Sequence, residues 1–218
     1  MTEQFTLSRP VSGWLRATFD RPPPNLLDAD TIGELAEIAD ILATDPELRV
    51  VVFDSLNPDF FMARYDLSAT PPDPADPFAA GLHAFADVAR RIADSPVISI
   101  AAIRGRARAI EIVVTGDDYD ALTAERYGWV NRAVPDAELD QFVARMARRI
   151  ASFDRAAVSV AKRLIARRGG VETDLAETIS ALPGVAAATR DRRAQLRELA
   201  QQVGVDFELR LGHHLGPR

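Results

Sequence analysis

The chain has 218 residues, of which 47% are hydrophobic and 27% are charged. This length suits one large domain, and the balance is typical of a globular protein without bilayer-spanning segments. The formal net charge of -6 argues against nucleic acid as a partner, and the absence of cysteine excludes disulfides and thiolate chemistry. The N-terminal residues lack a secretory signal pattern, so we expect a cytoplasmic protein that does not associate with membranes.

The N-terminal part of the chain begins with a predicted β-hairpin. Residues 5–9 and 14–19 alternate apolar and polar side chains on either side of a Pro-Val-Ser-Gly turn. A helix is predicted next, with Asp28 or Asp30 as its N-terminal cap. The continuous apolar run at residues 49–54 then predicts a buried strand.

A long loop rich in proline and aspartate follows this strand, and loops of such length are usually functional. Apolar residues at helical spacing then predict a second amphipathic helix: Phe78, Leu82, Phe85, Val88 and Ile92. Residues 95–105 predict a second buried strand. The order so far is hairpin, helix, strand, loop, helix and strand.

The second half of the chain is predicted to be nearly all helical. Residues 123–134 predict a short helix capped by Asp120 or Thr123, then a glycine stop and a strand. Two strong helices follow, with one face of the first marked by Phe142, Met146 and Ile150. The remaining residues are predicted to be helical, with a break at Pro183–Gly184.

Four segments carry a resemblance to a known family. Residues 13–55 hold the hairpin, an Arg-Pro turn, an Asn-Leu-Leu segment and the first helix and strand, and residues 59–68 read Asp-Phe-Phe-Met-Ala-Arg-Tyr-Asp-Leu-Ser. Residues 95–105 end in glycine, and residues 109–152 contain Thr-Gly and Ala-x-x-x-Gly-x-Val motifs. In this order they resemble the crotonase family, which includes the enoyl-CoA hydratases and isomerases.

The resemblance implies an α/β fold, a crotonase-like spiral of β-β-α units followed by a C-terminal helical region. Residues 1–108 would form the N-terminal part of the spiral. Residues 109–218 would form its remainder and the helices that assemble a homo-oligomer, either a trimer or a dimer of trimers. The spiral would be incomplete, because a segment that family members have would be missing at the boundary between these two parts.

The resemblance also implies a substrate and a chemistry. The substrate is an acyl-CoA thioester, with no cofactor beyond the coenzyme A that it carries, and two backbone N–H groups stabilise its enolate-like oxygen. One donor corresponds to Tyr65, and the neighbouring CoA and substrate contacts correspond to Ala63, Arg64, Asp66 and Leu67. This sequence has Arg64 and Tyr65 where the family pattern has Gly and Ala. The alternative is that both are ordinary exposed loop residues.

The junction at Gly105–Ala109 departs most from the family. There Arg-Gly-Arg-Ala-Arg runs directly into Ala-Ile-Glu-Ile-Val-Val-Thr-Gly. Family members have about fifty residues between these two stretches, which carry the glycine of the second oxyanion donor and the catalytic glutamates. We therefore hypothesise an internal deletion between two similar Gly-Arg-x-Arg stretches. The remaining explanations are a gene error and an omitted segment.

No other residue is predicted to replace the missing groups. Glu111 lies where the family has a structural glutamate, and the three histidines, His83, His213 and His214, form neither a Ser-His-Asp pattern nor metal-ligand spacing. The C-terminal basic segment favours a solvated helix face over a site for CoA phosphates: Arg190, Arg192, Arg193 and Arg197.

Two functions follow from the sequence. The first is a hydratase/isomerase family protein that acts on acyl-CoA thioesters, or descends from enzymes that do, with impaired catalysis. The second is a non-catalytic subunit that binds CoA or serves in assembly.

Overall fold

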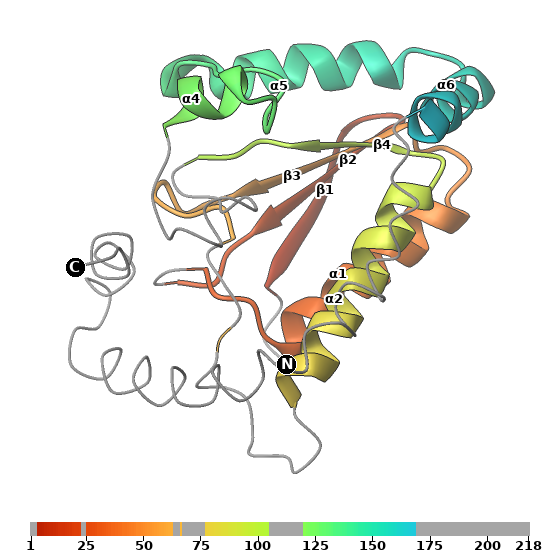
Figure 1. Ribbon diagram of the computed structural model, residues 1–218. Helices are drawn as coiled ribbons and strands as arrows, with labels where there is room; N and C mark the ends of the chain where they lie inside the picture. The colour runs from red at the N-terminus through yellow and green to blue at the C-terminus, as the bar shows by residue number, and fades with distance from the viewer. Residues whose placement is uncertain (1–3, 23–24, 63–65, 67–76, 105–119, 169–218) are drawn as a thin grey trace.

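The structure, a computed structural model, describes residues 4–22, 25–62, 66, 77–104 and 120–168. It contains a four-stranded sheet with helices on both faces (Figure 1). The strands are β1 (Phe5–Val11), β2 (Trp14–Phe19), β3 (Val50–Ser55) and β4 (Ile98–Ala101). The helices are α1 (Ala29–Thr44), α2 (Pro77–Asp94), α4 (Ala121–Arg126), α5 (Asp136–Ala151) and α6 (Arg155–Arg168).

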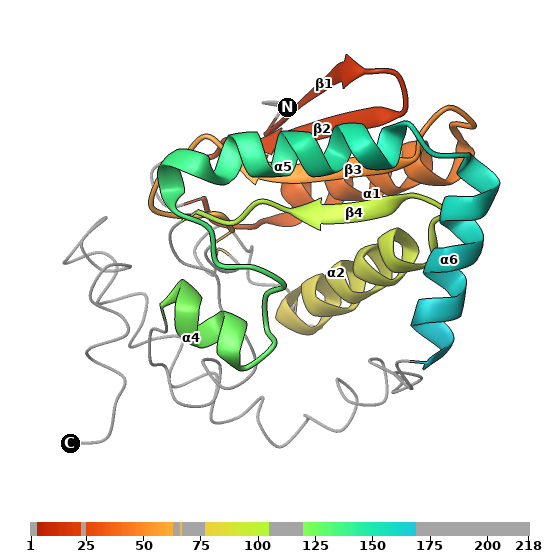
Figure 2. The ribbon, with the colours of Figure 1, turned by 90° about the horizontal axis from the view of Figure 1, so that it is seen from above.

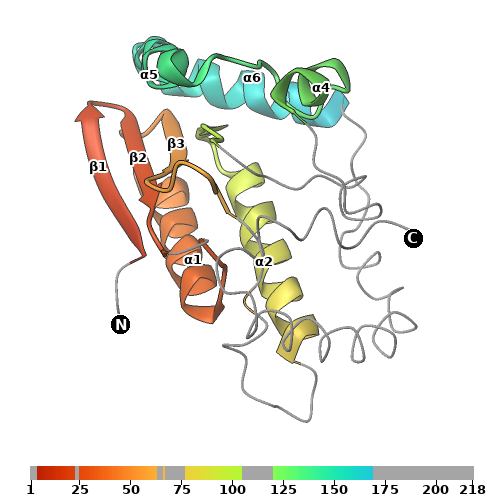
Figure 3. The ribbon, with the colours of Figure 1, turned by 90° about the vertical axis from the view of Figure 1, so that its left-hand side faces the viewer.

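The sheet has the order β1-β2-β3-β4, in which β1 and β2 are antiparallel and the other two pairs are parallel. Helices α1 and α2 cover one face and α5 covers the other (Figure 3). Viewed from above, α5 lies over β3, between β2 and β4 (Figure 2). Within the described part of the chain, β1 and β4 are the two edge strands of this sheet.

The apolar run of β3 serves two cores because successive strand side chains point to opposite faces. Val51 and Phe53 pack in the cluster shared with α1 and α2. Val50 and Val52 pack with Trp14 in the cluster beneath α5. All six residues of β3 are buried, which confirms the predicted buried strand.

The hairpin turn depends on Gly13. Its φ of 79° lies in the left-handed region, and its carbonyl accepts hydrogen bonds from the N–H groups of Arg49 (2.9 Å) and Val50 (3.0 Å). A Cβ at this position would lie 3.2 Å from the carbonyl oxygen of Ala151. The turn therefore needs glycine for its backbone angle and for the close approach of two neighbouring segments.

Helix α1 begins with a capping box. The Asp28 carboxylate accepts a hydrogen bond from the Thr31 N–H (2.8 Å), and the Thr31 hydroxyl accepts one from the Asp28 N–H (3.1 Å). Burial acts to raise the pKa of Asp28, but the hydrogen bonds from Thr31 and Gln4 and the charge of Arg21 outweigh it, so the pKa is lowered. Of the two predicted caps, Asp28 is therefore the one used.

Two details of the second half differ from the sequence prediction. Asp120 caps α4 as expected, but no strand follows within residues 129–135, because the N–H groups of Trp129 and Val130 bond back to the carbonyl of Ala124. On α5, Met146 is 38% exposed while Ala147 is fully buried. The small Ala147 side chain lets the helix approach the sheet, so its buried face is rotated away from Met146.

Candidate functional site

The carboxyl ends of β3 and β4 lie side by side. Phe53 is opposite Ala101 in the parallel pair, and the N–H of Ala102 donates to the carbonyl of Phe53 (2.9 Å). The loop after β3 and the segment after β4 therefore leave the sheet at the same edge. This is the usual place for a ligand site beside parallel strands, and both segments that the resemblance links to oxyanion donors start here.

The loop after β3 begins with a tight hydrogen-bonded turn. The Ser55 hydroxyl accepts a hydrogen bond from the Asn57 N–H (2.9 Å) and donates to the carbonyl of Phe60 (2.9 Å). The Asn57 side-chain oxygen accepts from the N–H groups of Asp59 (2.9 Å) and Phe60 (3.1 Å). These short-range bonds determine the direction in which the chain leaves the sheet.

Asn25, in the segment before α1, is hydrogen-bonded to this turn. It is fully buried and has a φ of 53°. Its side-chain nitrogen donates to the Ser55 hydroxyl (2.7 Å) and to the carbonyls of Phe60 (3.1 Å) and Phe61 (3.2 Å). Its side-chain oxygen accepts from the Arg21 N–H (2.9 Å). The segment before α1 and the loop after β3 thus form one hydrogen-bonded unit.

Asp66 is anchored as well. Its N–H donates to the carbonyl of Leu27 (2.6 Å), and its carboxylate pairs with the Arg21 guanidinium (3.3 Å). The same guanidinium pairs with Asp28 (2.8 Å) and donates to the carbonyl of Leu26 (2.7 Å). Arg21 therefore links this end of the loop to the first turn of α1.

Of the predicted site residues, the structure describes only Asp66, which lies beside Arg21 and Leu27. Ala63, Arg64, Tyr65 and Leu67 lie outside the described residues, so the Tyr65 donor and the substrate contacts stay predictions. Asn25 and Arg21 were not identified from the sequence. The available signal was an asparagine after three prolines, since asparagine is one of the few residues that tolerate a positive φ.

The segment after β4 is held by Arg104. Its guanidinium pairs with Asp136 (2.8 Å) and Asp140 (3.0 Å) in the first half of α5. The hydrogen bond that the Arg104 guanidinium donates to the Asp140 carboxylate is the main cause that raises the pKa of Arg104. The junction at Gly105–Ala109 and Glu111 lie outside the described residues.

Of the remaining predicted candidates, the structure describes only His83. His83 is exposed on α2, whereas His213, His214 and the C-terminal arginines lie outside the described part. No group of three potential metal ligands occurs among the described residues. None of the described helices is both long and apolar enough to cross a bilayer.

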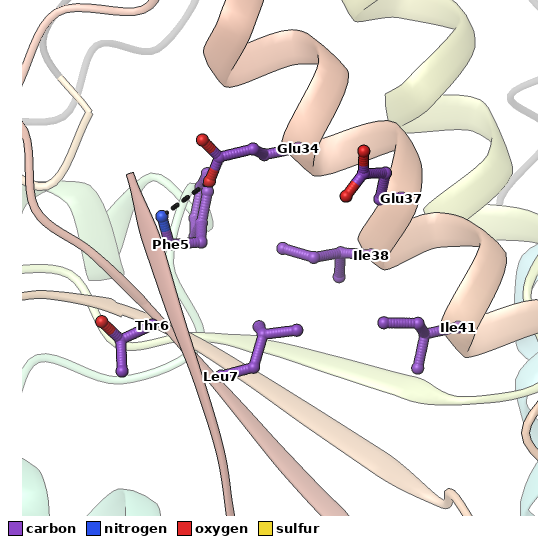
Figure 4. A pocket seen from close by; sticks show the side chains of 7 residues that line it. All are labelled: Phe5, Thr6, Leu7, Glu34, Glu37, Ile38 and Ile41. Atoms are coloured by element: carbon purple, nitrogen blue, oxygen red, sulfur yellow. Dashed lines mark hydrogen bonds between the residues drawn. The ribbon is translucent and has the colours of Figure 1, made fainter. Parts of the chain in front are cut away.

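A cavity of about 560 Å³ lies between α1 and β1, the outer strand on the side of the sheet away from β4 (Figure 4). Leu7, Ile38 and Ile41 line it with apolar side chains, and Glu34 and Glu37 add two carboxylates. The Glu34 carboxylate already accepts from the Phe5 N–H (2.8 Å). Two acidic side chains repel phosphate groups, so this cavity does not suit the CoA moiety.

The described elements thus form an α/β domain with a candidate ligand site at the carboxyl edge of parallel strands. The sequence model of the Enoyl-CoA hydratase/isomerase family matches residues 12–109. The crystal structure of a putative enoyl-CoA hydratase from Streptomyces avermitilis is 30% identical, with a TM-score of 0.79 over 98% of this chain and 96% of that one. The chain therefore belongs to the enoyl-CoA hydratase/isomerase family and has its crotonase-like fold.

Curated relatives match over shorter segments. A probable enoyl-CoA hydratase of Mycobacterium tuberculosis is 43% identical over 61 residues, which are 28% of this chain and 21% of the relative. The carnitinyl-CoA dehydratase of Escherichia coli K12 is 36% identical over 108 residues, which are 49% of this chain and 40% of the relative. The chain thus matches less than half the length of these relatives.

Proposed function

We propose that this protein binds acyl-CoA thioesters at the carboxyl edge of β3 and β4. It acts on them by oxyanion stabilisation, or descends from enzymes that do. The observation that carries the proposal is the pairing of Phe53 with Ala101, because it places the start of the loop with the predicted Tyr65 donor beside the end of the strand after which the family's second donor follows. The bonds from Asn25 and Arg21 support it further, since a backbone donor is effective only when it is held in place beforehand.

We further propose that catalysis is impaired. The sequence lacks the segment with the second oxyanion glycine and the catalytic glutamates. Two carboxylates at this edge do not replace them, because Asp54 is paired with Arg16 and Asp66 with Arg21. Loss of one oxyanion donor costs about 10²–10³ in rate, and loss of general acid–base catalysis costs about 10²–10⁴ more.

The proposal includes three expectations about the whole protein. The reaction needs no cofactor beyond the coenzyme A carried by the substrate. The protein is cytoplasmic and assembles as a homotrimer or a dimer of trimers. Its partner is the acyl-CoA ligand, with neither nucleic acid nor membrane involved.

Hydration of crotonyl-CoA by the purified chain tests the catalytic part, with a full-length family hydratase and a protein-free sample assayed in parallel. The expected rate lies about four to seven orders of magnitude below that of the full-length enzyme. A rate within about tenfold of that enzyme would overturn the proposed impairment. Calorimetric titration with butanoyl-CoA tests binding, and absence of both binding and turnover would reject the acyl-CoA function.

A non-catalytic CoA-binding or assembly subunit is the second candidate. It is favoured by apolar side chains on and between α5 and α6 that remain exposed: Met146, Phe153, Val160 and Ile165. Such a set is typical of a surface that contacts another protein chain. Micromolar CoA binding without turnover, or association with a full-length relative in light scattering, would support this candidate. A monomer that neither binds CoA nor associates would reject it.

A further inference from the structure

The cavity between β1 and α1 is separate from the proposed acyl-CoA site. In the sheet order β1-β2-β3-β4 it adjoins β1, whereas the proposed site lies at the carboxyl ends of β3 and β4. Its volume of about 560 Å³ falls within the range of about 300–1,000 Å³ that is typical of small-molecule sites. A ligand bound here would be independent of the proposed function.

The cavity has a charged end and an apolar end. Its α1 lining consists of Glu34, Glu37, Ile38 and Ile41, which are spaced three or four positions apart and so share one face of the helix. Ile41 lies about 10 Å along the helix axis from Glu34, at a rise of about 1.5 Å per residue. Figure 4 shows the two carboxylates at one end of the cavity, with Leu7 and Ile41 at the other.

The apolar end combines a fixed wall with an accessible one. Ile38 is 2% exposed and belongs to the core cluster beneath the sheet, and Ile41 packs against that cluster. Leu7, across the cavity on β1, is 41% exposed. A ligand that covers this aliphatic surface removes it from water, which favours binding of an apolar chain.

At the charged end, one carboxylate is held in place and the other is accessible. The Glu34 carboxylate accepts hydrogen bonds from the backbone N–H groups of Gln4 (2.9 Å) and Phe5 (2.8 Å). These donors orient the carboxylate but carry no net charge. Glu37 is exposed, and its carboxylate has no hydrogen bond within the described residues.

No basic side chain in the described ranges neutralises Glu34 or Glu37. Arg9, the basic residue of β1, pairs instead with Asp45 at the C-terminal end of α1 (2.6 Å). Two uncompensated negative charges attract a cation and repel a carboxylate or phosphate group. The cavity therefore suits a ligand with a positive head and an apolar chain.

We propose that this cavity binds a small amphiphilic amine. The ammonium head lies between the carboxylates of Glu34 and Glu37, which together have free acceptor sites for its three N–H donors. The alkyl chain packs along Leu7, Ile38 and Ile41. A chain that extends about 10 Å from the head reaches the apolar end of the cavity.

Calorimetric titration of the purified chain tests this with four probes: octylammonium, butylammonium, octan-1-ol and octanoate. Octylammonium is expected to bind most tightly and to saturate at one site. Butylammonium should bind more weakly, by up to about fourfold for each missing methylene group. Octan-1-ol lacks the charge and octanoate reverses it, so octanoate should bind at least about tenfold more weakly than octylammonium. Equal affinities for octylammonium and octanoate, or no saturable binding of octylammonium, would overturn the proposal.

The Glu37→Gln variant tests the charged end, because it removes one charge and keeps the shape of the side chain. Its affinity for octylammonium should fall about threefold to tenfold, with octan-1-ol unaffected. Glu47→Gln is the matched control, since Glu47 is exposed, follows the C-terminal end of α1 and does not line the cavity. Equal losses in the two variants would show that octylammonium responds to the net charge of the protein, which would reject this site.

The Leu7→Thr variant tests the apolar end. Leu7 is exposed and lies outside the core cluster, and threonine suits a strand, so the variant should fold. Its affinity should fall severalfold for octylammonium and much less for butylammonium, whose shorter chain does not reach Leu7. An equal loss for both amines would contradict the proposed orientation. If either variant fails to fold, the wild-type comparison of octylammonium with octanoate still decides between binding and no binding of the amine.

Discussion

The side-chain nitrogen of Asn25 donates a hydrogen bond of 3.1 Å to the carbonyl of Phe60. Asn25 precedes α1 and Phe60 lies in the loop after β3, so one buried amide joins two segments that are 35 residues apart. The φ of Asn25 at this contact is 53°, which lies in the left-handed region. In sequence this loop leads to Tyr65, so the Asn25–Phe60 contact and the bonds of Asp66 together constrain the proposed oxyanion loop.

Replacing Asn25 should therefore reduce stability strongly. Asn25→Ala is expected to lower the free energy of unfolding by about 2–4 kcal/mol, because buried acceptors lose their donor and alanine is strained at positive φ. Asn25→Gly removes the same hydrogen bonds but tolerates the backbone angle, so its loss should be smaller by about 1–2 kcal/mol. Urea unfolding measures both variants. Equal losses would show that the backbone angle contributes nothing.

The N-terminal cap of α1 should make stability depend on pH. Asp28 has a lowered pKa in the folded protein, so it contributes stability above its unfolded pKa of about 3.9, and this is lost as the pH falls through the lower folded value. Asp28→Asn keeps a capping oxygen but cannot titrate. The free energy of unfolding of this variant should be about 1 kcal/mol below that of the wild type at pH 7. The difference between the two proteins should shrink below about pH 4. Thermal unfolding across this range measures the difference.

Asp30→Asn is the control for that experiment. Asp30 is exposed in the same first turn, and the cap hydrogen bonds are made by Asp28. Its stability should follow the wild-type curve closely. A deficit for Asp28→Asn that stays constant from neutral pH to pH 2 would contradict the assignment of a charged cap.

Two glycines should respond oppositely to alanine. Gly13→Ala is expected to destabilise the protein by about 1–3 kcal/mol, because its φ of 79° is unfavourable for alanine and the new methyl group would approach the Ala151 carbonyl. Gly33→Ala is the matched control, since Gly33 lies on the exposed side of α1 and a methyl group there would have no neighbouring atom within 4 Å. It should stabilise the helix by about 0.5–1 kcal/mol. Equal changes in the thermal unfolding temperature of the two variants would show that Gly13 has no special backbone or packing requirement.

Arg104 should contribute a small, salt-dependent stabilisation. Its side chain is 19% exposed, but Asp136 and Asp140 are 80% and 64% exposed. Solvent screening therefore limits the expected loss in Arg104→Gln to about 1 kcal/mol, with a smaller loss at high salt. A double-mutant cycle with Asp140→Asn isolates the pair. A coupling that is zero at low salt would show that Arg104 does not hold α5 at this edge.

Much of the fold was predictable because its signals are local. The alternation in β2, the glycine of the hairpin turn and the aspartate cap of α1 act over a few neighbouring residues, and all three predictions are confirmed. The predicted strand after Gly128 is wrong because Trp129 bonds back to α4. The predicted face of Phe142, Met146 and Ile150 is only partly buried, because the sheet is contacted mainly through Val143 and Ala147, and helical spacing alone does not tell which flank approaches a sheet.

The amino-acid sequence was sufficient to identify the family, because ordered motifs persist even where individual residues depart from the pattern. The junction that it predicts at Gly105–Ala109 lies outside the described residues and stays a hypothesis. The three-dimensional arrangement was needed to show that Asn25 and Arg21 hold the loop after β3. It was also needed to show that the Lys162 Nζ atom donates hydrogen bonds to the carbonyls of Ile92, Ser95 and Val97. These contacts join residues 30 to 70 positions apart, and no local pattern encodes them, because they form only when the sheet brings the segments together.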